Sequence, residues 1–331
     1  MNATYFPGAN TGLGFVNRFD GIVPPWAKPH YTYVLKGGPG VGKNTLMRKV
    51  AARAAAKGYT VEEFRCASDP DSFDAVRVPD LGVVLLDGTA PHSIDPVIPG
   101  ACDEVIDLGH FLRHEEFMRE AATLRARFAA NKAHYARAYA CLAAARALTV
   151  QATDAAAEAL DMPAVRKALA PLFAGEGVGE SRRLFAASAT PRGVVDYTDT
   201  LHLSGVRRYG GAAGAAILRE AARMAKGRAV TLLGGFVMPE VPRCILLPAA
   251  GVTLCGGDDK PTEAATALLR SPLPDFVAYA RAESDNLVAR AVEELSACLA
   301  IHDEIEATYR PFVNYDRVNA ESDALLARLG L

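Results

Sequence analysis

The sequence predicts an α/β protein in which a parallel sheet carries helices on both faces, present as two tandem copies. Three observations support this prediction: an apolar β-type run leads into a glycine-rich loop and a helix over Tyr31–Leu46, a long alanine-rich helical stretch follows, and the pattern of the first half returns more weakly in the second. The expected division is a first core at 1–109, a helical arm at 110–178, a degenerate second core at 179–265 and a second helical arm at 266–331.

Composition sets broad limits on the class of protein. The chain has 331 residues, half of them hydrophobic, which is enough for two domains of ordinary size. No run approaches the roughly 18 to 20 apolar residues that a membrane span requires, and the N-terminus lacks a signal-peptide pattern, so we expect a cytoplasmic protein with no membrane partner. With 36 basic and 38 acidic residues, nucleic acid is not indicated as a partner. Six cysteines without C-x-x-C spacing indicate neither a zinc site nor a disulfide framework.

The stretch LKGGPGVGKNT, residues 35–45, matches the phosphate-binding pattern G-x-x-x-x-G-K-[S/T] at three of its four fixed positions. Glycines let the backbone N–H groups of such a loop approach a polyphosphate closely, the start of the following helix adds partial positive charge, and Lys43 can reach the β- and γ-phosphate oxygens. The predicted nucleotide-binding residues are Gly37, Gly38, Gly40, Val41, Gly42, Lys43, Asn44 and Thr45.

Asn44 occupies the position where a serine or threonine normally ligates Mg²⁺. The spelling GGPGVGKNT is similar to the adenylate-kinase form of the loop, in which the matching threonine stands one place later, at Thr45 here. We therefore expect Mg²⁺ to be held mainly through water and phosphate oxygens, with Asn44, Thr45 and Asp87 as candidate metal residues.

Asp87 ends the near-continuous apolar run Leu81–Leu86, which is typical of a buried parallel strand. A carboxylate at the tip of a strand beside a phosphate loop usually anchors Mg²⁺ through water, so Asp87 resembles a Walker B aspartate. Gly88 stands where many ATPase motors carry a water-activating glutamate, and rapid hydrolysis is therefore not expected. His92 follows closely and is a candidate for sensing the γ-phosphate or positioning water, although a loop-stabilising role fits it equally well.

The segment SDPDSFD places Asp69, Asp71 and Asp74 in a loop after the expected strand YTVEEFRC, at the same edge of the sheet as the phosphate loop. Asp69 or Asp71 could orient or deprotonate a substrate hydroxyl. The alternative is an Asx-turn followed by a helix N-cap, which Asp and Ser provide in most loops. The predicted catalytic residues are Lys43, Asp87, His92 and Asp69.

A second, degenerate copy is indicated because LFAASATPRGVVDYTDTL aligns with YFPGANTGLGFVNRFDGI at a constant offset of 179, so that Thr11 meets Thr190 and Asp20 meets Asp199. Further on, RRYGGAAGAAILREAARMAKG lies where the phosphate loop and its helix lay, without the lysine, and Gly256 stands where Asp87 stood. We therefore expect that the second core no longer binds phosphate or metal strongly. Chance similarity remains the alternative for the alanine-rich arms.

These segments resemble a family of largely uncharacterised bacterial P-loop proteins, described as ATP-binding or ATPase, in which two such halves occur in tandem. The segments that carry the resemblance are TGLGFVNRFDGIVP, LKGGPGVGKNTLMRKV, CASDPDSFD, LDGTAPHSIDP and PGACDEVIDLG, so it covers about the first 110 residues closely and the rest loosely. It implies a P-loop NTPase-type fold with ATP and Mg²⁺ as cofactors, and it gives no substrate. This chain departs from the family pattern at Asn44 and in the missing second loop.

Two functions follow from these features. The first is a slow ATPase or nucleotide-dependent switch whose arms transmit the nucleotide state to an unidentified protein or small-molecule partner. The second is a small-molecule or nucleotide kinase with Asp69 and Asp71 at the acceptor. The duplicated architecture with one lost site favours the switch, whereas the loop spelling and the missing glutamate favour the kinase.

Overall fold

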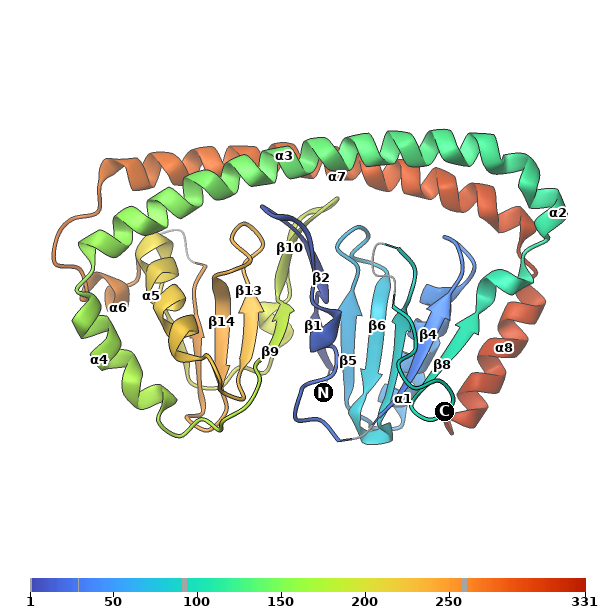
Figure 1. Cartoon of the computed structure of the whole chain (residues 1–331), viewed down its shortest axis with the longest axis horizontal. Helices are drawn as coiled ribbons and strands as arrows, with labels where there is room; N and C mark the ends of the chain where they lie inside the picture. The colour runs from blue at the N-terminus through green and yellow to red at the C-terminus, as the bar shows by residue number, and fades with distance from the viewer. Residues whose placement is uncertain (1, 29, 91–93, 258–260) are drawn as a thin grey trace.

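The computed structural model describes residues 2–28, 30–90, 94–257 and 261–331, and within them it has the mixed α/β character that the sequence predicts. Figure 1 shows two sheets standing side by side, strands crowded between them, and a pair of long helices spanning both. Short 3₁₀ segments connect the main elements: η1 (Phe19–Gly21), η2 (Pro79–Leu81), η3 (Leu108–Phe111), η4 (Met118–Glu120), η5 (Thr198–Thr200) and η6 (Arg310–Phe312).

The first sheet is mixed, so the prediction of a parallel sheet is wrong. Its strands, in the spatial order β1-β5-β6-β7-β4-β8, are β1 (Asn2–Tyr5), β5 (Val61–Arg65), β6 (Phe73–Val78), β7 (Val83–Asp87), β4 (Tyr31–Lys36) and β8 (Asp103–Asp107). Strand β4 is parallel to β7 and β8, whereas β6 is antiparallel to both of its neighbours. The turn Pro79–Gly82 explains this, because parallel strands need a crossover of a dozen or more residues and a turn this short permits only an antiparallel hairpin.

The second sheet repeats the pairing pattern of the first. In the order β12-β15-β14-β13-β9 it contains β12 (Val206–Arg208), β15 (Val252–Cys255), β14 (Pro242–Leu247), β13 (Thr231–Gly234) and β9 (Arg182–Phe185). From β12 to β9, successive strand pairs are parallel, antiparallel, antiparallel and parallel, in the same order as the pairs of β4-β7-β6-β5-β1 in the first sheet. Cys244 and Cys255 face each other on β14 and β15 and form a disulfide bond, which corrects the expectation that no cysteines pair.

Helices cover one face of each sheet, and the expectation of helices on both faces is also wrong. Helices α1 (Lys43–Ala56) and α8 (Tyr315–Arg328) pack on the first sheet, and α5 (Gly211–Met224) and α4 (Met162–Phe173) pack on the second. The other faces of the two sheets pack against each other. Their shared core joins Phe64, Val84 and Leu86 to Leu233 and Cys244. Both faces of each sheet are thus buried, which explains their apolar strands.

Two hairpins lie between the sheets and form an antiparallel sheet of four strands. They are β2 (Gly8–Thr11) with β3 (Gly14–Asn17), and β10 (Ala187–Thr190) with β11 (Gly193–Asp196), and their bounds differ by the offset of 179. Phe6 and Phe185, which also differ by 179, exchange backbone hydrogen bonds of 2.8 and 3.0 Å. The hydroxyls of Thr11 and Thr190 accept and donate the same local bonds in the two turns.

The arms cross from one half of the molecule to the other. Helices α3 (Ala121–Ala159) and α7 (Asp275–Tyr309) run antiparallel along the top of Figure 1, and the short helices α2 (His114–Phe117) and α6 (Glu263–Thr266) lie near their ends. Small side chains such as Ala138, Ala145 and Ala291 let α3 and α7 approach closely. Because of the crossing, α4 packs on the second core and α8 on the first. None of the helices in the described residues is long and apolar enough to span a membrane.

Candidate functional site

The glycine-rich loop connects the end of β4 to the start of α1, where the motif predicts it. Gly37, Gly40 and Gly42 have φ angles of +128°, +73° and +107°. L-residues with a Cβ rarely adopt these angles, so the course of the loop depends on glycine at all three positions. Val41 is fully buried and anchors the loop in the first core.

Lys43 lies at the first position of α1 and is 9% exposed. Its Nζ donates hydrogen bonds to the backbone carbonyls of Gly37, at 2.5 Å, and Gly38, at 3.1 Å, and lies 3.6 Å from Oδ2 of Asp87. Burial lowers the pKa of Lys43, and the carboxylate of Asp87 partly opposes that effect. The loop therefore holds a desolvated cation at the N-terminus of a helix, where an anion would find both an ammonium group and free backbone N–H groups.

Asp87 lies at the end of β7, directly beside the loop. Its Oδ1 accepts hydrogen bonds from the backbone N–H of Thr89, at 2.8 Å, and from the Thr89 hydroxyl, at 2.5 Å. These bonds fix the carboxylate so that Oδ2 is the oxygen nearer to Lys43. The structure thus brings together the two residues that the sequence singled out most strongly.

Asn44 and Thr45 are placed differently from what a metal site requires. The Asn44 amide donates to the Ser72 hydroxyl at 3.1 Å, and its oxygen accepts from the backbone N–H of Phe73 at 3.1 Å. Both polar groups are therefore used to fasten α1 to the start of β6. Thr45 is exposed on α1. Of the three candidate metal residues, Asp87 is the one with an oxygen beside the loop lysine.

Asp69 and Asp71 occupy structural positions in the described residues. Asp69 accepts hydrogen bonds from the backbone N–H of Asp71, at 3.2 Å, and from the Ser72 hydroxyl, at 2.5 Å, which makes the Asx-turn that was the alternative to a substrate contact. Asp71 forms an ion pair with Arg192 of the second hairpin. The remaining predicted catalytic residue, His92, lies outside the described residues.

Asp74 is a site residue that the sequence analysis assigned to the wrong element. It was expected in a loop, yet it lies in β6 and is 3% exposed. The register that pairs Ala75 with Leu86 places Asp74 opposite Asp87, because β6 runs antiparallel to β7. Its carboxylate also acts electrostatically on Lys43. The alternation FDAVRV is a strand signal that could have identified this position.

The C-terminal arm covers the glycine-rich loop, which the sequence did not predict. A Cβ added to Gly38 would lie 2.3 Å from the ring of Tyr309, at the end of α7, and one added to Gly42 would lie 2.9 Å from Val318 of α8. The hydroxyl of Tyr315 donates to the carbonyl of Gly40 at 2.9 Å. Residues from the far end of the chain therefore form part of the wall around the loop.

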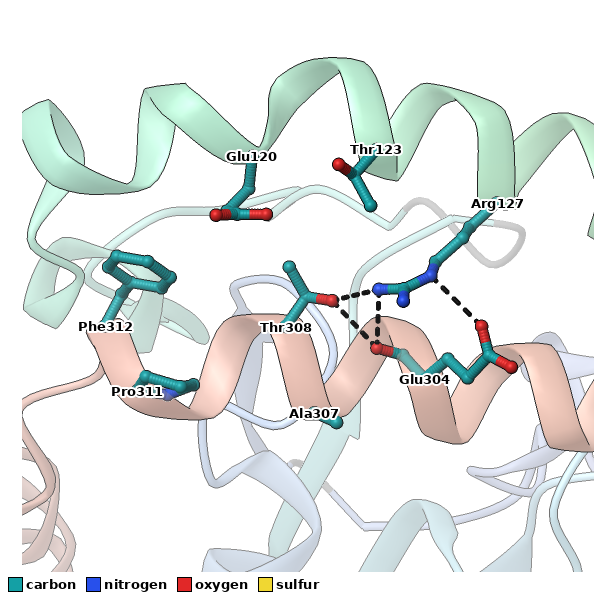
Figure 2. A pocket seen from close by; sticks show the side chains of 8 residues that line it. All are labelled: Glu120, Thr123, Arg127, Glu304, Ala307, Thr308, Pro311 and Phe312. Carbon is teal, nitrogen blue, oxygen red and sulfur yellow. Dashed lines mark hydrogen bonds and ion pairs between the residues drawn. The ribbon is translucent and has the colours of Figure 1, made fainter.

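A shallow groove of about 480 Å³ opens on the other side of α7, between this helix and the start of α3 (Figure 2). Arg127 crosses it and pairs with Glu304 at 3.1 Å and with the hydroxyl of Thr308. Its full lining is Glu120, Thr123, Arg127, Glu304, Ala307, Thr308, Pro311 and Phe312. The predicted site residues do not line this groove, and its charges are largely paired with each other.

Across the described part of the chain, no three His, Cys, Asp or Glu side chains gather in a way that could hold a metal ion. Any Mg²⁺ at the loop would depend on Asp87, water and phosphate oxygens, which is how this ion is often bound. No protein-family model, no curated protein and no solved structure matches the chain.

Proposed function

We propose that the first half of the chain binds a nucleoside triphosphate, ATP with Mg²⁺, in a P-loop-type site, and that the protein is a slow ATPase or a nucleotide-dependent switch. The observation that carries the proposal is the convergence of Lys43 and Asp87, 3.6 Å apart, on a loop whose three glycines have positive φ angles. A motif match alone would not require a strand-end carboxylate to meet the lysine in space.

The contacts of the loop suggest how a phosphate would be held. The ammonium of Lys43 now donates to two neutral carbonyls, and charged phosphate oxygens are stronger acceptors, so they would replace these carbonyls. The Oδ2 atom of Asp87, 3.6 Å from Nζ of Lys43, would accept a hydrogen bond from a water bound to Mg²⁺, and the ion would neutralise charge on the phosphates. Gly88 supplies no carboxylate to activate water, which supports slow rather than rapid turnover.

We also propose that the two halves are tandem copies of one unit. The matching strand orders, the common offset of the two hairpins and the reciprocal Phe6–Phe185 bonds support this proposal. The second copy has Gly210 before its helix, Gly211 at the first helical position and Gly256 directly after β15, and so lacks the lysine and carboxylate of a phosphate site. Its role would then be to cover the first core and supply the arm that reaches the loop.

The positions of Asp69 and Asp71 count against the kinase alternative, whereas the loop spelling and the missing glutamate still favour it. Asp69 is held in a turn and Asp71 is paired with Arg192, so each carboxylate already has a partner within the protein.

Binding of a fluorescent ATP analogue with Mg²⁺ tests the proposal. We expect the full-length protein to bind the analogue, and Lys43→Ala to weaken binding by about 100-fold or more, because a buried charge-assisted contact is lost at the centre of the site. Lys49→Ala, on the same helix but 33% exposed and facing Asp323, is the matched control and should bind normally. EDTA should weaken binding to the wild type. Equal affinities for wild type and Lys43→Ala would refute the site.

A further inference from the structure

The end of α7 places two oppositely charged side chains beside the glycine-rich loop. Glu306 and Arg310 are one turn apart, and Nη2 of Arg310 donates to Oε2 of Glu306 at 2.8 Å. A Cβ added to Gly40 would lie 3.6 Å from Cβ of Glu306 and 3.6 Å from Cγ of Arg310. Both side chains therefore begin next to the loop that is proposed to hold phosphate.

These two side chains would affect a triphosphate in opposite ways. The carboxylate of Glu306 is close enough to Lys43 to oppose the lowering of its pKa by burial, after the larger contribution of Asp87. A negative charge in this position would repel phosphate. The side chain of Arg310 is 62% exposed, and its guanidinium has a single carboxylate partner among the described residues, so this pair is the main contact that fixes its position.

We propose that the Glu306–Arg310 pair senses the terminal phosphate of the nucleotide, with Arg310 leaving Glu306 to bind the γ-phosphate. This inference rests on the proposed function, because it concerns the same loop. A guanidinium forms two parallel hydrogen bonds with a phosphate, and the phosphate carries more charge than the carboxylate it replaces. Glu306, repelled by the same phosphate, would turn away from Lys43, and the end of α7 would respond to the presence of the γ-phosphate.

The position of the Glu306–Arg310 pair would connect the two halves of the molecule. Glu306 and Arg310 lie on the arm that begins beside the second core, while the loop belongs to the first. On the opposite side of the same turn of α7, Glu304 and Thr308 contact Arg127 of α3. A change at the loop would thus reach the contact between the two long helices.

The test compares affinities for ATP and ADP in five full-length proteins: the wild type, Lys43→Ala, Arg310→Ala, Glu306→Gln and Arg281→Ala. Arg310→Ala should lose about tenfold or more in affinity for ATP and change by less than about twofold for ADP, since a hydrogen bond to a charged group is removed only where the γ-phosphate is present. Glu306→Gln should bind ATP more tightly, because it removes the repulsion and frees Arg310. Arg281→Ala, which breaks the Arg281–Asp285 pair of 2.8 Å near the start of α7, is the matched control and should resemble the wild type.

The outcomes separate this inference from the proposal on which it rests. If the wild type binds neither nucleotide, or Lys43→Ala binds both normally, the proposed function fails and the inference fails with it. If those proteins behave as proposed but Arg310→Ala matches Arg281→Ala, only the inference is overturned. Equal losses for ATP and ADP in Arg310→Ala, or weaker ATP binding by Glu306→Gln, would indicate a purely structural arm and would also overturn it.

Discussion

Arg182 should be the most important single side chain in the contact between the two halves. It lies at the start of β9, is 6% exposed, and stacks over the ring of Tyr5. Its guanidinium donates to both carboxylate oxygens of Glu62, at 2.8 and 3.0 Å, and to the backbone carbonyls of Gly21 and Ile22, at 2.8 and 3.2 Å. Every one of these partners belongs to the first half of the chain.

We predict that Arg182→Met lowers the free energy of unfolding by about 3 to 5 kcal/mol. Breaking a buried ion pair by removing one partner typically costs this much, because the other charge is left buried without compensation. Arg77 stays bound to Glu62 at 2.6 Å and would limit the loss, whereas the two carbonyls that lose their donor would add about 1 kcal/mol each. The balance of these effects keeps the expected cost within the stated range.

Urea unfolding followed by circular dichroism measures this cost, and Arg192→Met provides the control. Arg192 also pairs with an acidic residue of the first half, Asp71, but these side chains are 55% and 59% exposed. An exposed pair contributes at most about 1 kcal/mol, so the control should lose little stability. If the two variants unfold at the same urea concentration, burial is not what makes the Arg182 contact strong, and the reasoning is refuted.

Two further predictions concern pH and redox state. Burial raises the pKa of Glu62, but Arg182 and Arg77 lower it by more, so the folded pKa lies below the ordinary value of 4.5. The stabilisation from the ionised Glu62 is therefore complete above that pH and is lost as the pH falls through the folded pKa. Below about pH 4.5, the free energy of unfolding of the wild type should decrease more steeply with falling pH than that of Arg182→Met. Equal slopes for the two proteins in this range would contradict the prediction. Reducing the Cys244–Cys255 bond, which closes a segment of 11 residues, should cost about 3 kcal/mol of stability, measured by urea unfolding with and without reductant and checked by thiol titration. Two new thiols without a change in the urea midpoint would count against a stabilising disulfide.

The sequence was informative where one short segment determines its own structure. The strand, loop and helix over Tyr31–Leu46 could be predicted because glycine spacing, β-branched residues and a helix-forming run are local signals. The antiparallel direction of β6 was missed because the prediction assumed that strands and helices alternate along the chain. The hairpin signal was present in Pro79–Gly82, whose glycine has a positive φ angle, but no helix separates β6 from β7 and the assumption of a parallel sheet concealed it.

The positions of the arms could not be predicted from any local signal. Helices α3 and α7 each bury a row of mostly small side chains, which requires a partner but does not identify it. Pairing these two helices over their whole length moves the end of each arm onto the opposite core, and this outcome depends on contacts between residues more than 100 positions apart, such as His134 and Glu294 at 2.7 Å. Tyr309 and Tyr315 were therefore missed as neighbours of the loop.

The exchange of arms gives a physical reason why a second half without a phosphate site would remain necessary to the first. Helix α8 buries Val318, Leu325 and Leu326 against α1 and the first sheet, in the same core that holds Val41 of the loop. Without this helix the outer face of the first core would expose a contiguous apolar surface, which isolated domains rarely tolerate. Through its C-terminal arm, the second half completes the core beneath the loop and supplies Tyr309 and Tyr315, which face the loop. The proposed nucleotide site therefore depends on both halves, although its motif lies in one.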